Sequence, residues 1–256
     1  MGLVPVHKVA AMGKDRLSSR FVIGLLSAAG AALVAAFVLG PAALLGSEAD
    51  LAGAVGRALV EFRQSGGSQL PAGLKDLVDY WFEWHAIKVV ITSFMLVTFG
   101  LLATAWWRRY RRGGAGCAVA AVGASVLTGI ATAVLILNIQ ATVVPLVALL
   151  PLASSDGSET LLGPAGSPAQ TVLVGEVERY HWVMVGVAGP ALVVAGLISA
   201  LLWRRRVADD ARVFVARRAT SVVAGLMASL LLLVVAFSAY SAVEPADALR
   251  GLLGLG

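Results

Sequence analysis

The sequence predicts an all-α integral membrane protein, built as a bundle of five transmembrane helices with short amphipathic helices on the outer face. Hydrophobic residues make up 59% of the 256 residues, charged residues make up 14%, and the mean hydropathy is +0.85. A soluble domain is about 45–50% apolar and about 25% charged. Disorder and a collagen-like fibre are therefore excluded, and the single cysteine, Cys117, cannot form an internal disulfide.

Five apolar stretches are long enough to cross the hydrocarbon core of a bilayer, which takes about 20 helical residues. Each stretch is bounded by charges or turn residues, and none carries Asp, Glu or Arg in its interior. Such a charge costs about 2.5–3.5 kcal/mol at mid-bilayer on insertion scales. We expect spans at Phe21–Gly46, Ala86–Trp107, Ala115–Asn138, His181–Trp203 and Ser221–Val243.

The first span has a basic leader, and Ser47-Glu48-Ala49 resembles a signal-peptide cleavage site. The apolar core of a secretory signal runs about 7–15 residues, which is shorter than this stretch. We therefore expect the first span to be retained, with residues 1–20 as a cytoplasmic basic arm before it.

The basic residues predict the orientation. With the N-terminus inside, the inner segments hold 14 of the 20 Lys and Arg residues and three of the 15 acids, so their net charge is +11. The outer segments hold six basic and twelve acidic residues, a net charge of −6. An excess of Lys and Arg marks the cytoplasmic side. We expect a cytoplasmic N-terminus and an external C-terminus, and the pI of 9.8 then requires no nucleic-acid partner.

Two helices are expected in the first outer loop, residues 47–85. Apolar residues recur at helical spacing over Glu48–Gln64, and Ser47 with Asp50 three residues later resembles a capping box. Pro71 can begin a second helix, which we expect to run on into the second span.

The third apolar stretch continues to Ala153, which is far more than one crossing needs. We expect its span to end near Gln140, a segment broken by Pro145 to follow over Val143–Leu152 on the outer face, and a loop to occupy Ser154–Pro168. The next outer loop is thus residues 139–180.

An internal repeat of 96 residues is visible without gaps. Trp84-His85 matches Tyr180-His181, and Trp107-Arg108-Arg109 matches Trp203-Arg204-Arg205. The unit is a helical hairpin that occurs twice in the same orientation, over residues 21–107 and 108–203. Residues 204–256 then supply a cytoplasmic basic loop, the fifth span and an outer tail. The outer end of each odd-numbered span also carries a proline: Pro41, Pro145 and Pro245.

These motifs resemble those of a group of multi-pass membrane proteins found in actinobacteria. The resemblance rests on Trp84-His85-Ala86-Ile87-Lys88, Asn138-Ile139-Gln140 and Tyr180-His181, and it covers nearly the whole chain. Members of the group are often labelled as having a twin-arginine signal, but no such pair precedes the first span here. The group carries no assigned activity, so the resemblance implies fold and topology and no function.

His85 and His181 are the sharpest candidates for a cofactor site, because they occupy equivalent positions at the outer ends of two spans. Two histidines on facing helices can ligate haem, and histidine with carboxylates can bind a metal. Glu178 lies three residues before His181, but position 82 in the first copy is Phe82. The alternative, which we favour, is that both histidines are interfacial and lie apart without a shared cavity. We therefore expect no cofactor, no metal and no catalytic residue.

Other polar and small residues favour structural roles. Lys88 is expected to extend to the headgroups with Trp84 beside it, and Asn138 and Gln140 are expected to mark the interface or to bond a neighbouring helix. Small residues form a ridge on each of two helices, and both ridges, with Cys117 as a packing residue, are expected to be buried: Gly24, Ala28, Ala32, Ala36 and Gly40 on the first, and Cys117, Ala121, Ser125, Gly129 and Ala133 on the third.

No nucleotide-binding, zinc-protease, hydrolase or EF-hand motif is present, and the soluble segments are too short for a separate catalytic domain. Four lysines against sixteen arginines are typical of a GC-rich bacterial genome. We expect a non-enzymatic inner-membrane protein, accessory or envelope-associated, whose partners are membrane lipids and another membrane protein or a second copy. The alternatives are a small transporter or channel component and a membrane redox protein that uses His85 and His181.

Overall fold

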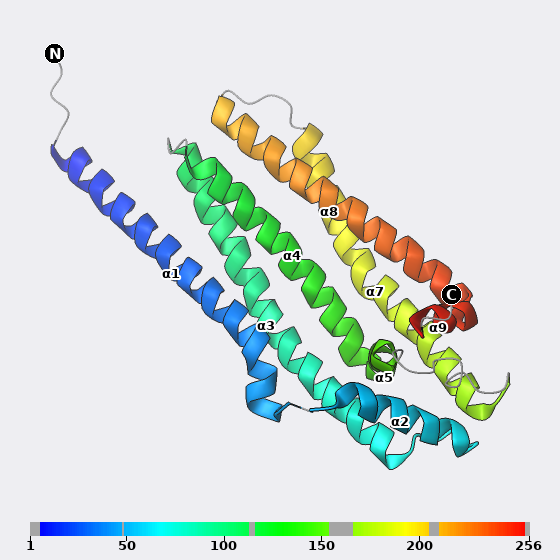
Figure 1. The fold of residues 1–256 in the computed structure, drawn as a ribbon. Coiled ribbons are helices and arrows are strands. Elements are labelled where there is room, and N and C mark those ends of the chain that lie inside the picture. Colours follow the sequence, from blue (N-terminus) through cyan, green and yellow to red (C-terminus); the bar gives the residue numbers. More distant parts are fainter. Residues whose placement is uncertain (1–5, 48, 113–115, 154–165, 205–209, 254–256) are drawn as a thin grey trace. The chain divides into compact units, whose positions relative to one another are not determined.

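The computed structural model describes residues 6–47, 49–112, 116–153, 166–204 and 210–253. Five of its helices are long and apolar enough to cross a membrane (Figure 1). The expected all-α fold is confirmed, and the described residues contain no strand. The elements are α1 (Val6–Leu45), α2 (Leu51–Gln64), α3 (Ala72–Arg111), α4 (Cys117–Val143), α5 (Pro145–Leu149), the 3-10 helix η1 (Leu150–Ala153), α7 (Pro168–Arg204), α8 (Ala211–Val243) and α9 (Pro245–Leu252).

The chain forms two compact units, each drawn from several helices. Unit 1 comprises residues 1–38, 91–133 and 195–226, and unit 2 comprises residues 39–90, 134–194 and 227–256. By sequence, the ranges of unit 1 hold 14 of the 20 basic residues and three acids, and those of unit 2 hold six basic residues and twelve acids. The charged residues that the sequence assigns to opposite sides of a membrane therefore belong to different units.

The core of unit 1 lies between α1, α3 and α4. Phe99 of α3 is 6% exposed and packs on Gly30 of α1, where a Cβ atom would lie 2.8 Å from the Phe99 ring. The glycine thus lets an aromatic ring lie directly against the α1 backbone. Other members of this core include Ile23, Met95, Leu102, Ala124 and Ala131.

The expectation of two buried small-residue ridges is wrong for α1. Gly24, Ala28 and Ala32 are exposed, whereas the packed face carries Ile23 and Gly30 together with the larger side chains Leu26, Leu33 and Phe37. Helix α1 therefore gains contact area from large side chains, and at Gly30 its backbone lies directly against Phe99 of α3.

On α4 the ridge does take part in packing. Ala121 is fully buried, Cys117 is half-buried, and Trp107 donates a hydrogen bond from Nε1 to Ser125 Oγ at 3.1 Å. The Ser125 hydroxyl in turn donates to the Ala121 carbonyl at 2.9 Å.

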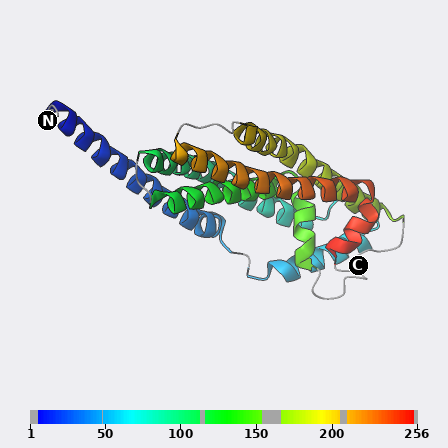
Figure 2. The same cartoon turned by 90° about the horizontal axis from the view of Figure 1, so that it is seen from above.

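Unit 2 is closed by a cap of short helices, which we define as α2, α5, η1 and α9. In both views these helices gather at the same ends of the long helices (Figures 1 and 2). They share one apolar core with the first turns of α3 and α7. Its fully buried members include Val55, Phe62, Leu74, Val147, Leu149, Val177 and Leu249. The amphipathic helices expected from the sequence thus bury their apolar faces in one core together with α3 and α7.

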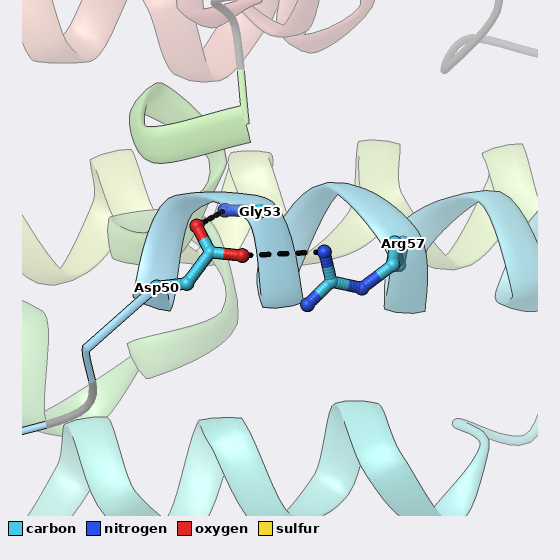
Figure 3. Close-up of polar contacts among 3 residues, drawn as sticks. All are labelled: Asp50, Gly53 and Arg57. Carbon is cyan, nitrogen blue, oxygen red and sulfur yellow. Dashed lines mark hydrogen bonds and ion pairs between the residues drawn. The ribbon is translucent and has the colours of Figure 1, made fainter.

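The start of α2 differs from the expectation. The helix begins at Leu51, and its N-cap is Asp50 instead of Ser47. One carboxylate oxygen of Asp50 accepts a hydrogen bond from the Gly53 amide at 3.2 Å, and the other lies 3.2 Å from Arg57 Nη1 (Figure 3). A carboxylate at this position satisfies a free amide and also interacts with the positive end of the helix dipole.

The prolines act differently at the three helix ends that the sequence predicts to lie outside. Helices α4 and α8 end at Val143 and Val243, and Pro145 and Pro245 open α5 and α9 at their first turns. Proline favours that position because the first-turn amide needs no partner within the helix. Pro41 instead lies inside α1, which ends at Leu45 where Gly46 adopts a φ of +79°.

Helix α3 runs unbroken from the outer loop through the second span, as expected, and α3 and α7 begin 96 residues apart, at Ala72 and Pro168. Residues 154–165 of the expected outer loop, residues 113–115 at the start of the expected third span, and residues 205–209 of the basic loop lie outside the described residues.

Candidate functional site

The two histidines both lie in unit 2, on α3 and α7, but their surroundings differ. His85 is half-buried, and its Nδ1 lies 3.0 Å from the Trp81 carbonyl oxygen. Because a carbonyl oxygen only accepts, Nδ1 must carry the proton, and Nε2 of the neutral ring keeps its lone pair. The Trp81 ring lies 4.6 Å from the imidazole, so this histidine is held by its own helix.

His181 is 7% exposed, and neither of its ring nitrogens has a hydrogen-bond partner among the described residues. The Tyr180 ring meets it edge-on at 5.5 Å. A buried polar group without a partner costs about 1–3 kcal/mol. The neutral imidazole offers one donor and one acceptor, so a water molecule or a small polar ligand could satisfy both.

Unit 2 also buries polar side chains on the helices next to α7. The neighbouring apolar cluster contains Ile136 of α4, Met184 of α7 and Leu231 of α8. Gln140 lies one turn from Ile136, His181 one turn from Met184, and Ser238 two turns from Leu231, each on the same face of its helix. Their side chains are buried, with Gln140, His181 and Ser238 being 2%, 7% and 5% exposed. We call these three residues the polar layer. It comprises an amide, an imidazole and a hydroxyl, buried on three different helices of unit 2.

Gln140 ties two of these helices together. Its Nε2 donates to the Tyr180 carbonyl at 3.0 Å, which confirms the expected bond from α4 to a neighbouring helix. Asn138 differs, because its amide donates to Val134 of its own helix at 2.7 Å. Both side chains are buried.

The other candidate residues have simpler surroundings. Lys88 Nζ lies 5.4 Å from the centre of the Trp84 ring, as expected for a cation held beside an interfacial aromatic ring. Glu178 is exposed and so does not share the buried surroundings of His181. Within the described ranges no group of three or more His, Cys, Asp or Glu side chains could hold a metal ion. The separation of His85 from His181 stays a prediction.

Two functional features escaped the sequence reasoning. One is a pair of serines, Ser199 and Ser221, that joins α7 to α8, and the other is the stacking of Arg218 on Trp203. A signal existed for the first, because Ser221 and Gly225 are small residues four apart on α8.

No protein-family model matches the chain, and neither a curated protein nor a solved structure matches it. The functional argument therefore rests on the residues and contacts described above.

Proposed function

We propose that this chain is a multi-pass protein of a bacterial cytoplasmic (inner) membrane, with its N-terminus in the cytoplasm and its C-terminus outside. The five apolar helices support a membrane location. The orientation is supported by the charges, since the sequence ranges of unit 1 carry a net charge of +11 and those of unit 2 carry −6. Lys and Arg accumulate on the cytoplasmic side of membrane proteins.

Its role in this proposal is that of a non-enzymatic accessory or envelope-associated protein, and the cap is the observation that carries it. The large apolar side chains of α2, α5, η1 and α9 pack into the core that these helices share. The outward side chains are charged and exposed, among them Asp50, Arg57, Glu61, Asp247 and Arg250. A charged surface of this kind suits the electrostatic steering of a protein partner of complementary charge outside the membrane.

Reporter fusions test the orientation. Fusions after Arg112 and after Arg206 are expected to be active only in the cytoplasm, and fusions within residues 154–168 only outside. An external signal after Arg112 would overturn the topology.

Site-specific photo-crosslinking in living cells tests the role. A crosslinking amino acid at Glu61, which is exposed on α2, is expected to yield one discrete protein adduct. The matched position is Phe237 on α8, which is 68% exposed on an apolar face and is expected to react with lipid. The absence of any protein adduct from Glu61 and from a second cap position, Arg57, would contradict an accessory role.

A second candidate, a small transporter or channel component, is favoured by the polar layer. Buried polar residues within membrane helices often mark a substrate or ion pathway. The single cysteine makes a direct test possible: Ser238→Cys in a Cys117→Ala background, treated with a membrane-impermeant maleimide. Labelling would support a water-filled path to the polar layer. Glu61→Cys serves as the labelled control and Phe237→Cys as the unlabelled control, and an unlabelled Ser238→Cys would contradict this candidate.

A further inference from the structure

The feature that the proposed function leaves unused is a cluster of arginines where α7 ends and α8 begins in unit 1. Arg218 of α8 stacks on the Trp203 ring of α7, with its Cζ atom 3.5 Å from the ring centre. The Phe214 ring lies 5.8 Å from the same atom. Stacking of this kind engages the face of the guanidinium group and leaves its N–H donors, which lie in the plane, directed outward.

Those donors have no acceptor within the described part of the chain. All three ion pairs found among the described residues involve unit 2: Arg57 with Asp50, Arg179 with Glu176, and Arg250 with Asp247. The four described arginines of the cluster are Arg204, Arg212, Arg217 and Arg218. The one carboxylate described beside them, Asp210, accepts instead from the Arg212 backbone amide at 2.8 Å.

The described arginines of the cluster on α8 lie within its first two turns. Helix α8 begins at Ala211, so Arg212 lies in its first turn and Arg217 and Arg218 lie about two turns in. A helix N-terminus carries a positive partial charge, which repels cations and attracts anions. The arginines Arg108, Arg109 and Arg111 lie instead in the last turn of α3, where the helix end itself is negative. On α8 only Arg212 lies within the first turn that this field reaches, so Arg217 and Arg218 offer their charges largely by themselves.

The surroundings of these arginines favour an anion that carries acyl chains. Trp203 and Phe214 are 43% and 41% exposed, as is typical of aromatic side chains at the level of lipid headgroups. Exposed apolar side chains continue along both helices, including Leu197, Leu201, Val222 and Leu226. An anion with acyl chains would use both the arginines and this apolar surface, whereas a free phosphate would use only the arginines.

We propose that Arg218, held by Trp203, together with Arg204, Arg212 and Arg217, binds the phosphate headgroup of an anionic phospholipid. The guanidinium fork of Arg218 matches two phosphate oxygens. The headgroup of phosphatidylglycerol has no ammonium group, so no cation within the lipid competes with the arginines for its phosphate. The acyl chains then lie along the apolar faces of α7 and α8.

Native mass spectrometry of the full chain, purified from bilayers of phosphatidylcholine with graded phosphatidylglycerol, tests this site. The affinity for the first retained phosphatidylglycerol is expected to fall about fivefold in Arg218→Gln, because the contacts of the guanidinium fork with the phosphate are lost; a fivefold change corresponds to about 1 kcal/mol. Arg112→Gln removes the same charge from unit 1 at a residue for which no ring stacking is found, and it is expected to leave this affinity within about twofold.

Three further outcomes decide the proposal. Arg218→Lys keeps the charge but loses the planar fork, so an affinity between those of the wild type and Arg218→Gln supports the site. Equal losses in Arg218→Gln and Arg112→Gln would show attraction by net charge alone and would overturn it. Displacement of the lipid by excess inorganic phosphate would also overturn it, since the ligand would then be a free anion.

Discussion

Ser199 and Ser221 exchange hydrogen bonds across α7 and α8. Each hydroxyl donates to the backbone carbonyl of the other residue at 2.9 Å. Gly225 lies one turn along α8, where a Cβ atom would be 3.1 Å from Ser199 Oγ. Small residues let the two backbones approach, so each hydroxyl reaches the carbonyl oxygen of the facing serine. This pair fixes how two membrane helices meet in unit 1.

The serine pair predicts a measurable coupling. Ser199→Ala and Ser221→Ala, combined in a double-mutant cycle, are expected to show a coupling free energy of about 0.6 kcal/mol, with an upper range of about 1.7 kcal/mol. The measurement is reversible unfolding in detergent micelles. Thr104→Ala, whose hydroxyl bonds only Gly100 of its own helix, is the control and should not couple to either serine. Strict additivity of the two serine variants would contradict the pair.

The cap is expected to depend on Phe62. This side chain is 1% exposed within the apolar core that α2, α5, η1 and α9 share. Phe62→Ala should lower the free energy of unfolding by about 3–5 kcal/mol, because it removes buried area and leaves a cavity. Thermal unfolding and protease sensitivity of the cap measure the loss. Phe237→Ala removes the same side chain from a position that is 68% exposed and should change stability by about 0.5 kcal/mol or less.

Asp50 is expected to hold the start of α2. Asp50→Ala removes the N-cap bond to the Gly53 amide and should cost about 0.5–2 kcal/mol. The exposed ion pair with Arg57 adds little to that figure, because both side chains are well solvated. Hydrogen exchange at the Gly53 amide should accelerate in Asp50→Ala. In Glu61→Ala, which changes an exposed carboxylate in the last turn of the same helix, that amide should exchange as in the wild type.

Replacement of the two histidines by leucine is expected to change the stability of the protein differently. His181→Leu removes a buried ring with two unpartnered nitrogens, so stability in detergent without added ligand should be unchanged or higher. His85→Leu removes a hydrogen bond to Trp81 and a ring contact, and stability should fall by about 1 kcal/mol. A clear loss in His181→Leu would show that a ligand or bound water satisfies the imidazole.

A visible absorption spectrum of the purified protein tests the redox alternative. No haem band is expected, because a bis-histidine haem needs two rings that face a common space. A haem band that disappears in both His85→Leu and His181→Leu would reverse this expectation and would make the two histidines a shared site.

Much of the fold could be predicted from local sequence. A membrane-crossing helix satisfies its backbone hydrogen bonds within one apolar segment, so length and hydropathy suffice to locate it. The continuity of α3 and the break before Pro145 also follow from short-range rules, and both are confirmed. The amphipathic pattern of α2 likewise predicted a helix with one buried face, although the cap residue proved to be Asp50 instead of Ser47.

The packing faces could not be predicted in the same way. A helix that is apolar all round carries no pattern that separates lipid from neighbouring helices, since both are apolar. The small ridge of α1 therefore looked like a packing face, yet the tertiary structure packs the face of Ile23, Leu26 and Gly30.

The polar sites show the same division. The sequence by itself showed that His85 and His181 match in the 96-residue repeat, that Gln140 lies near the end of the third apolar helix and that arginines gather near the ends of the helices. Only the tertiary structure decided that His181 is buried without a hydrogen-bond partner among the described residues, and that Arg218 stacks on Trp203. The physical reason is range: helix formation and membrane insertion depend on residues within one segment, whereas burial, hydrogen-bond satisfaction and stacking depend on side chains that other helices bring alongside.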